Sequence, residues 1–81
     1  MDKKQKAQMS EELLANDVLQ SAFSVVSEYH TSVFAHVSAT EAEVLEARRM
    51  VLALNEVKNQ LHRYVATGQI IKKRDQDRAD D

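Results

Sequence analysis

The chain has 81 residues, no cysteine, no proline and one glycine, Gly68. A chain of this length supports one domain, and without cysteine it has neither disulfide bonds nor thiolate metal ligands. The scarcity of glycine and proline excludes a turn-rich β fold, and 43% hydrophobic with 30% charged residues is typical of amphipathic helices. The formal net charge of -2 gives no overall basic field that would attract nucleic acid. We therefore expect a single helical domain over residues 1–81.

Residues 1–15 form a polar segment that carries lysines near its start. One interpretation of residues 1–12 is a helical turn or two that end near Leu13, Leu14 and Ala15. Ser10 offers another helix start, because a serine oxygen accepts a free backbone N–H at a helix N-terminus. A frayed end is the alternative for residues 1–8. No apolar run follows the lysines or approaches the roughly 20 residues that span a bilayer, so we expect no secretory signal and no membrane partner. The expected location is the cytoplasm, or a particle assembled there.

Residues 17–37 are predicted to form the first long helix. Either Asn16 or Asp17 offers a side chain that can cap its N-terminus. Apolar residues then recur with helical spacing, and Leu19, Val26 and Val33 fall on one line. Other apolar residues widen this face to roughly half of the helix circumference, which is more than one packing seam needs. Two phenylalanines belong to this wider face, namely Phe23 and Phe34.

A second long helix is predicted over residues 41–67. Thr40 and Glu43 have the spacing of a capping box, in which each side chain accepts a hydrogen bond from the other residue's backbone N–H. Acidic residues are frequent in the first turns, where the helix dipole favours negative charge. The predicted core line of this helix consists of Ala47, Leu54 and Leu61.

Gly68 is predicted to end the second helix in the left-handed conformation that glycine adopts easily. Residues 72–81 follow as a charged tail, for which a further helical turn or two is the alternative. A short connection between two long helices places them antiparallel. The sequence therefore predicts an all-α fold, a long antiparallel helical hairpin with a short N-terminal helical segment over residues 1–15. A lone hairpin covers only one side of each helix, so we expect oligomerisation or a partner to complete it.

Two leucines lie on the side of the second helix that faces away from its predicted core line. Leu45 and Leu52 are one heptad apart and project about 180° from Leu54. The hairpin does not need them, so they predict a second contact, either with the N-terminal segment or with another chain. The candidate protein interface consists of Leu45, Leu52, Phe23, Phe34, Arg49 and Arg63, with the two arginines setting the register.

The side chains that carry chemistry form no catalytic or metal-binding pattern. His30, His36 and His62 are scattered, and no two of them are four residues apart on one helix face. With one glycine there is no glycine-rich phosphate loop. We therefore expect no enzyme activity, no catalytic residue, no cofactor and no metal site.

Basic residues cluster near both ends of the chain. In a hairpin that starts and finishes at the same end, these clusters meet in a positive patch able to contact phosphates. Acidic residues follow closely in the tail and no aromatic platform accompanies the bases, so nucleic-acid binding is an alternative and not the leading hypothesis. The candidate phosphate contacts are Lys3, Lys4, Lys6, Lys72, Lys73 and Arg74.

Two stretches resemble known sequences. Residues 14–23 read LANDVLQSAF, in which a leucine, a small residue and an asparagine precede an alanine and an aromatic residue. Residues 53–61 read ALNEVKNQL, and residues 65–70 read VATGQI, with a threonine and a glycine near the end of a helix. This combination is similar to short, largely uncharacterised helical proteins of tailed bacteriophages, often encoded among their particle genes. The resemblance covers about residues 14–70, implies a phage setting and carries over no functional residues.

The leading hypothesis is a non-enzymatic helical assembly or adaptor protein, a phage virion or assembly component that acts through helix–helix contacts. It would work as a homo-oligomer or as part of a larger protein assembly. The first alternative is a small phage inhibitor that binds a host protein through the same apolar residues. The second alternative is a nucleic-acid-binding accessory protein that uses the basic ends of the chain.

Overall fold

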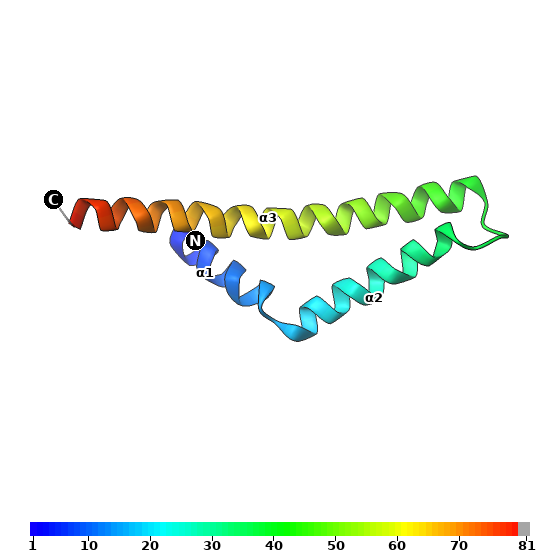
Figure 1. Cartoon of the computed structure of the whole chain (residues 1–81), viewed down its shortest axis with the longest axis horizontal. Coiled ribbons are helices and arrows are strands. Elements are labelled where there is room, and N and C mark those ends of the chain that lie inside the picture. Colours follow the sequence, from blue (N-terminus) through cyan, green and yellow to red (C-terminus); the bar gives the residue numbers. More distant parts are fainter. Residues whose placement is uncertain (80–81) are drawn as a thin grey trace. The chain divides into compact units, whose positions relative to one another are not determined.

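The computed structural model describes residues 1–79 and consists there of three α-helices: α1 (Lys3–Leu14), α2 (Asp17–Phe34) and α3 (Glu41–Ala79) (Figure 1). The predicted all-α fold is confirmed. The contacts divide the chain into two compact units. Unit 1 comprises Met1–Asn16 and Lys58–Asp81, and unit 2 comprises Asp17–Val57. The long helix α3 therefore contributes its first part to unit 2 and its last part to unit 1.

In unit 1, α1 runs antiparallel to the later part of α3 (Figure 1). It begins at Lys3 because Asp2 caps it, with the Asp2 carboxylate accepting from the Gln5 N–H at 2.7 Å and the Gln5 side chain accepting from the Asp2 N–H at 3.3 Å. The predicted N-terminal helical segment is confirmed, and α1 ends at Leu14, as expected, whereas a helix start at Ser10 and the alternative of a frayed end are both wrong. Ser10 is a buried residue in the middle of α1, and its hydroxyl donates to the Lys6 carbonyl at 2.6 Å.

Gly68 does not end the second helix as predicted. Its φ is not positive, and α3 continues through it to Ala79, so the predicted helix end at residue 67 is wrong and most of the predicted tail is helical. Residues 80 and 81 of that tail lie outside the described residues. The lack of a Cβ at Gly68 instead makes room for Ala7, because a Cβ built at residue 68 would lie 2.2 Å from the Cβ of Ala7. Glycine allows α1 and α3 to approach more closely than two alanines would.

Unit 2 is an antiparallel hairpin of α2 and the first part of α3 (Figure 1). The helix α2 ends at Phe34, three residues before the predicted end at residue 37. The Ala35 and His36 N–H groups bond to carbonyls three residues back instead of four, which tightens the last turn and ends the helix. The predicted capping box of the next helix is confirmed, with the Glu43 N–H donating to the Thr40 hydroxyl at 3.2 Å.

The core of unit 2 is small. Ala47 is buried with 3% exposure, as its place on the predicted core line requires. Val26, predicted at the centre of the packed face of α2, is 39% exposed, whereas Phe23 and His30 are half-buried. The packed face of α2 is therefore rotated from the predicted line toward Phe23. The rotation exposes the opposite edge of the wide apolar face.

Candidate interaction surfaces

The rotation of α2 leaves an apolar stripe in solvent. Val18, Ala22, Val25 and Tyr29 are spaced four, three and four residues apart, which places them on one side of a helix. Val18 is 79% exposed, Val25 62% and Tyr29 68%. We call these four residues the α2 outer stripe. Its spacing is that of a packing seam, but the hairpin of unit 2 does not cover it.

Leu45 and Leu52 form a second exposed apolar feature, which we call the α3 outer pair. Each leucine is 53% exposed, so the structure places both of them outside the packed side of α3, as the helical spacing indicated. Nearby, Arg49 is exposed and its guanidinium lies 3.8 Å from the Glu46 carboxylate. Charged side chains, Glu46 and Arg49, therefore lie near the α3 outer pair, unlike the α2 outer stripe.

The other predicted interface residues are divided between different environments. Phe23 is half-buried on the packed side of α2, whereas Phe34 is 45% exposed at the end of that helix. Arg63 lies in unit 1, on a different unit from the leucines that it was predicted to accompany. Its guanidinium donates to the Gln60 side-chain oxygen at 2.8 Å. The structure therefore does not group all six predicted residues on one surface within one unit.

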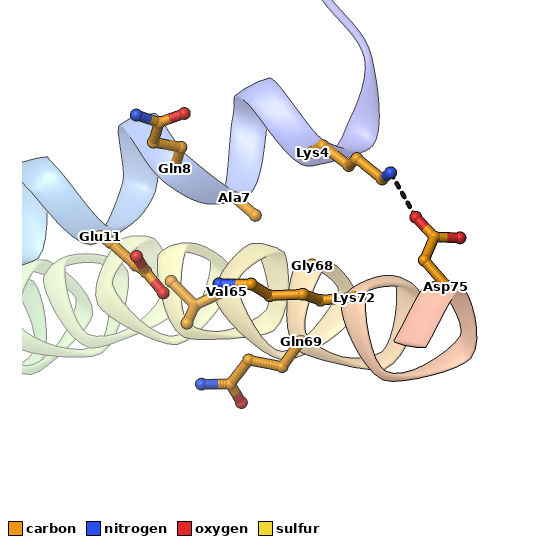
Figure 2. Close-up of a pocket in the computed structure, with 9 residues that line it drawn as sticks. All are labelled: Lys4, Ala7, Gln8, Glu11, Val65, Gly68, Gln69, Lys72 and Asp75. Atoms are coloured by element: carbon orange, nitrogen blue, oxygen red, sulfur yellow. Dashed lines mark hydrogen bonds and ion pairs between the residues drawn. The ribbon is translucent and has the colours of Figure 1, made fainter. Parts of the chain in front are cut away.

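Unit 1 contains an open groove between α1 and α3, with a volume of about 580 Å³ (Figure 2). Ala7, Val65 and Gly68 form its apolar floor, and Figure 2 shows Ala7 directed at Gly68. Polar and charged side chains line the remainder of this groove, which we call the Lys4 groove: Lys4, Gln8, Glu11, Gln69, Lys72 and Asp75.

Lys4 and Asp75 close one end of the Lys4 groove. The Lys4 ammonium forms an ion pair with the Asp75 carboxylate (Figure 2). The hydrogen bond from Lys4 and then its positive charge hold the pKa of the Asp75 carboxyl below its usual value, and Arg78 and Arg74 act in the same direction. The pair joins α1 to α3 across 71 positions of sequence. One of the candidate phosphate contacts is therefore neutralised within the protein.

A second groove in unit 1 is lined by basic, amide and hydroxyl side chains. Its volume is about 350 Å³. The Lys6 ammonium lies 4.9 Å from the centre of the Tyr64 ring, which is within the range of a cation–π contact. We call it the Tyr64 groove, and its lining consists of Lys3, Lys6, Gln60, Arg63, Tyr64 and Thr67.

The basic residues at the two ends of the chain thus separate into different sites. Lys3 and Lys6 line the Tyr64 groove, whereas Lys4 and Lys72 line the Lys4 groove. Lys73 and Arg74 are exposed and line neither groove. Sequence reasoning placed the clusters at the same end but missed Arg63 as a partner of the lysines. It also missed Tyr64, because only the packing of α1 brings an aromatic ring beside Lys6.

Within residues 1–79, no group of three or more histidine, aspartate and glutamate side chains is placed to hold a metal ion. Over the same residues no helix combines the length and the apolar character needed to cross a bilayer. His36 accepts or donates a hydrogen bond with the Ser38 hydroxyl at 3.0 Å in the loop after α2. His62 is exposed on α3.

The chain was compared with protein-family models, curated proteins and solved structures, and nothing matches in any of the three comparisons.

Proposed function

We propose that this is a non-enzymatic helical assembly protein that acts through helix–helix contacts, and that its first partner is a second copy of the same chain. The observation that carries the proposal is the α2 outer stripe. Ala47 is the one residue of unit 2 that is buried, while three large side chains of that stripe are more than 60% exposed. A hairpin that leaves such side chains in solvent is suited to packing against another helix.

The energetic argument rests on the size of the exposed side chains. Fully burying one valine-sized or larger apolar side chain stabilises an interface by about 1.5–3 kcal/mol. Val18, Val25 and Tyr29 together therefore offer several kcal/mol, before the cost of association is subtracted. A whole small domain is stable by only about 5–15 kcal/mol. Covering the α2 outer stripe is thus comparable with the stability of the unit itself.

The charge pattern of α2 favours a second copy over a charged partner. Between Asp17 and Phe34 the helix carries no lysine or arginine, and its only acidic residues are Asp17 and Glu28. Serine, threonine and glutamine occupy most of its remaining polar positions. Two such helices can approach with little charge repulsion, and four-three-four spacing is the spacing of knobs-into-holes packing. A strongly charged partner would find no complementary charges there.

Analytical ultracentrifugation tests the proposal. The wild-type protein is expected to form a dimer or larger oligomer at micromolar concentration, and the double variant Val25→Gln with Tyr29→Gln is expected to shift toward monomer. Ser24→Gln with Thr31→Gln is the matched control, because both positions are exposed on α2 outside the stripe. A wild-type protein that stays monomeric would exclude self-association, and equal behaviour of the two double variants would exclude the α2 outer stripe.

The α3 outer pair is tested separately. Leu45→Glu with Leu52→Glu, measured in the same way, shows whether these leucines take part in assembly. Unchanged assembly in this variant would restrict the interface to the α2 outer stripe. All four side chains of the two pairs are exposed by more than half, so each pair is accessible to a partner.

The resemblance of residues 14–70 to helical proteins of tailed phages supports a virion or its assembly as the setting. Mass spectrometry of purified particles is then expected to detect the chain. The alternative, an inhibitor of a host protein, uses the same exposed residues but would be absent from particles. Absence from particles together with a stable complex with one host protein would replace the assembly proposal by that alternative.

A further inference from the structure

The positive charges of the chain are concentrated in unit 1. By sequence, unit 1 carries nine of the 11 lysines and arginines against seven of the 13 acidic residues, whereas unit 2 carries two against six. The net charge of -2 is therefore the sum of a basic unit 1 and an acidic unit 2. An anionic ligand is attracted to unit 1 even though the whole chain is weakly acidic.

Within unit 1, the first turn of α1 holds lysines and no acidic residue. The dipole of a helix makes this end positive already, so acidic residues are the stabilising choice there. Asp2 caps the helix, and Asp75 neutralises Lys4. Lys3 and Lys6 lie outside that ion pair and line the Tyr64 groove. Lys3 and Lys6 thus add two positive charges to the groove at the positive end of the α1 dipole.

Across the Tyr64 groove, α3 adds further hydrogen-bond donors. Gln60, Arg63, Tyr64 and Thr67 are spaced three, one and three residues apart, which places them on one side of α3. The guanidinium of Arg63 donates to the side-chain oxygen of Gln60, which leaves the Gln60 NH₂ as a donor. Of the side chains that the structure describes, those lining the groove include three cations and no carboxylate.

We propose that the Tyr64 groove binds the phosphodiester backbone of a single-stranded nucleic acid. Three cations, an amide and hydroxyl groups suit phosphate oxygens, which only accept hydrogen bonds. Tyr64 places an aromatic ring beside these cations, and aromatic side chains commonly accompany the basic grooves of single-strand sites. Binding to a lipid surface usually adds apolar side chains that enter the membrane. The lining of the groove provides none besides Tyr64.

The salt dependence of binding measures how many phosphates are contacted. Each phosphate contact to a single strand contributes about -0.7 to the slope of log K against log salt concentration. If Lys3, Lys6 and Arg63 each contact one phosphate, the expected slope is about -2. Removing two of these cations should bring the slope to about -0.7 and lower the affinity about tenfold or more at low salt.

Fluorescence anisotropy with a labelled single-stranded oligonucleotide tests the proposal on the full chain. The groove variant is Lys3→Gln with Arg63→Gln, and the control is Arg48→Gln with Arg49→Gln, which removes the same charge from unit 2. All four side chains are exposed, so both variants are expected to fold, and circular dichroism checks that they do. We expect wild-type affinity from the control and the weakened, less salt-dependent binding from the groove variant.

Three outcomes would overturn the proposal. The first is no oligonucleotide binding by the wild-type protein at low salt. The second is equal weakening in both variants, which would reflect net charge alone. The third is evidence that another source of phosphate occupies the groove. Inorganic phosphate would show this by displacing the oligonucleotide at equal phosphate concentration. Vesicles of phosphatidylserine with phosphatidylcholine would show it by binding while the oligonucleotide does not. The oligomer measurements on α2 variants do not depend on any of these results.

Discussion

Gly68→Ala tests the role of glycine in the close approach of α1 and α3. An alanine Cβ at this position would lie 2.2 Å from the Cβ of Ala7, whereas carbon atoms in contact are normally about 3.5–4.0 Å apart. The helices must therefore separate by more than 1 Å, roughly, to accommodate it. In an isolated helix the same substitution would be stabilising by about 1 kcal/mol, because alanine is the better helix former. The steric clash therefore lowers the stability, whereas the higher helix propensity of alanine raises it.

The expected magnitude follows from the buried residues at this contact. Ala7 is 7% exposed and Ser10 is 3% exposed, so moving α1 away exposes both residues. Inserting a methyl group into a packed contact typically costs about 1–3 kcal/mol. Subtracting the gain in helix propensity, we expect Gly68→Ala to weaken the docking of α1 by up to about 2 kcal/mol. The later part of α3 should itself remain helical.

A double variant separates packing from helix propensity. With Ala7→Gly present, the nearest remaining atom to the new Cβ is the residue 7 Cα at 3.7 Å, which is an ordinary contact. Ala7→Gly combined with Gly68→Ala is therefore expected to restore the docking of α1. The coupling free energy between the two sites should be about 1–3 kcal/mol. Ala66→Gly, at an exposed position of α3, calibrates the propensity difference alone.

The measurements are urea unfolding followed by circular dichroism and hydrogen exchange of the α1 backbone amides. Gly68→Ala should accelerate exchange throughout α1, and the double variant should return it to the wild-type rate. The reasoning would be refuted if Gly68→Ala raised the unfolding free energy by the full propensity gain and left α1 protection unchanged. A double variant with no recovery would also contradict the assigned contact.

Three other substitutions test individual contacts. Because the pKa of Asp75 is lowered in the folded protein, the stability that its ion pair contributes is present above the unfolded value near 3.8 and is lost as pH falls through the folded pKa. An NMR titration of Asp75 should move to higher pH in Lys4→Gln, and acid should loosen α1 in the wild type only. Ala47→Leu should lower the unfolding free energy of unit 2 by about 1–3 kcal/mol because the site is buried, while Ala53→Leu at an exposed position should change it little in thermal unfolding. Thr40→Ala removes the cap of α3 and should cost about 1 kcal/mol, measured by urea unfolding. The Asp75 ion pair would be contradicted if the titration were unchanged in Lys4→Gln. The burial of Ala47 would be contradicted if Ala47→Leu and Ala53→Leu had equal effects, and the cap of α3 if Thr40→Ala left the stability unchanged.

Caps were predictable from the sequence where the interaction is local. Thr40 and Glu43 are three residues apart, so their spacing alone predicts the hydrogen bonds that the structure contains. Gly68 shows where such local rules fail. A glycine near the end of an apolar pattern normally ends a helix. Here Ala7 occupies the space next to Gly68. Ala7 is 61 positions away in the sequence, so no local pattern predicts this contact.

The orientation of α2 was only partly predictable for a related reason. Helical spacing identifies which residues share a side, but an apolar face covering half of the circumference does not specify which arc meets the neighbouring helix. Phe23 and Phe34 are the two phenylalanines of this face, and the structure half-buries Phe23 while it leaves Val26 39% exposed. The α2 outer stripe is exposed because of this orientation of α2. The same limit applies to Tyr64, whose place beside Lys6 depends on how α1 packs.

Ionic strength separates the two proposed activities. Packing of the α2 outer stripe buries apolar side chains on a helix with few charges, so raising the salt concentration should leave the oligomer unchanged or strengthen it. Contact of Lys3, Lys6 and Arg63 with phosphates should instead weaken steeply over the same range. Sedimentation and oligonucleotide anisotropy measured in one potassium chloride series give both responses from a single preparation. If the oligomer dissociated with salt as steeply as the nucleic-acid complex, charged contacts would hold it together, and the apolar stripe would lose its role as the assembly surface.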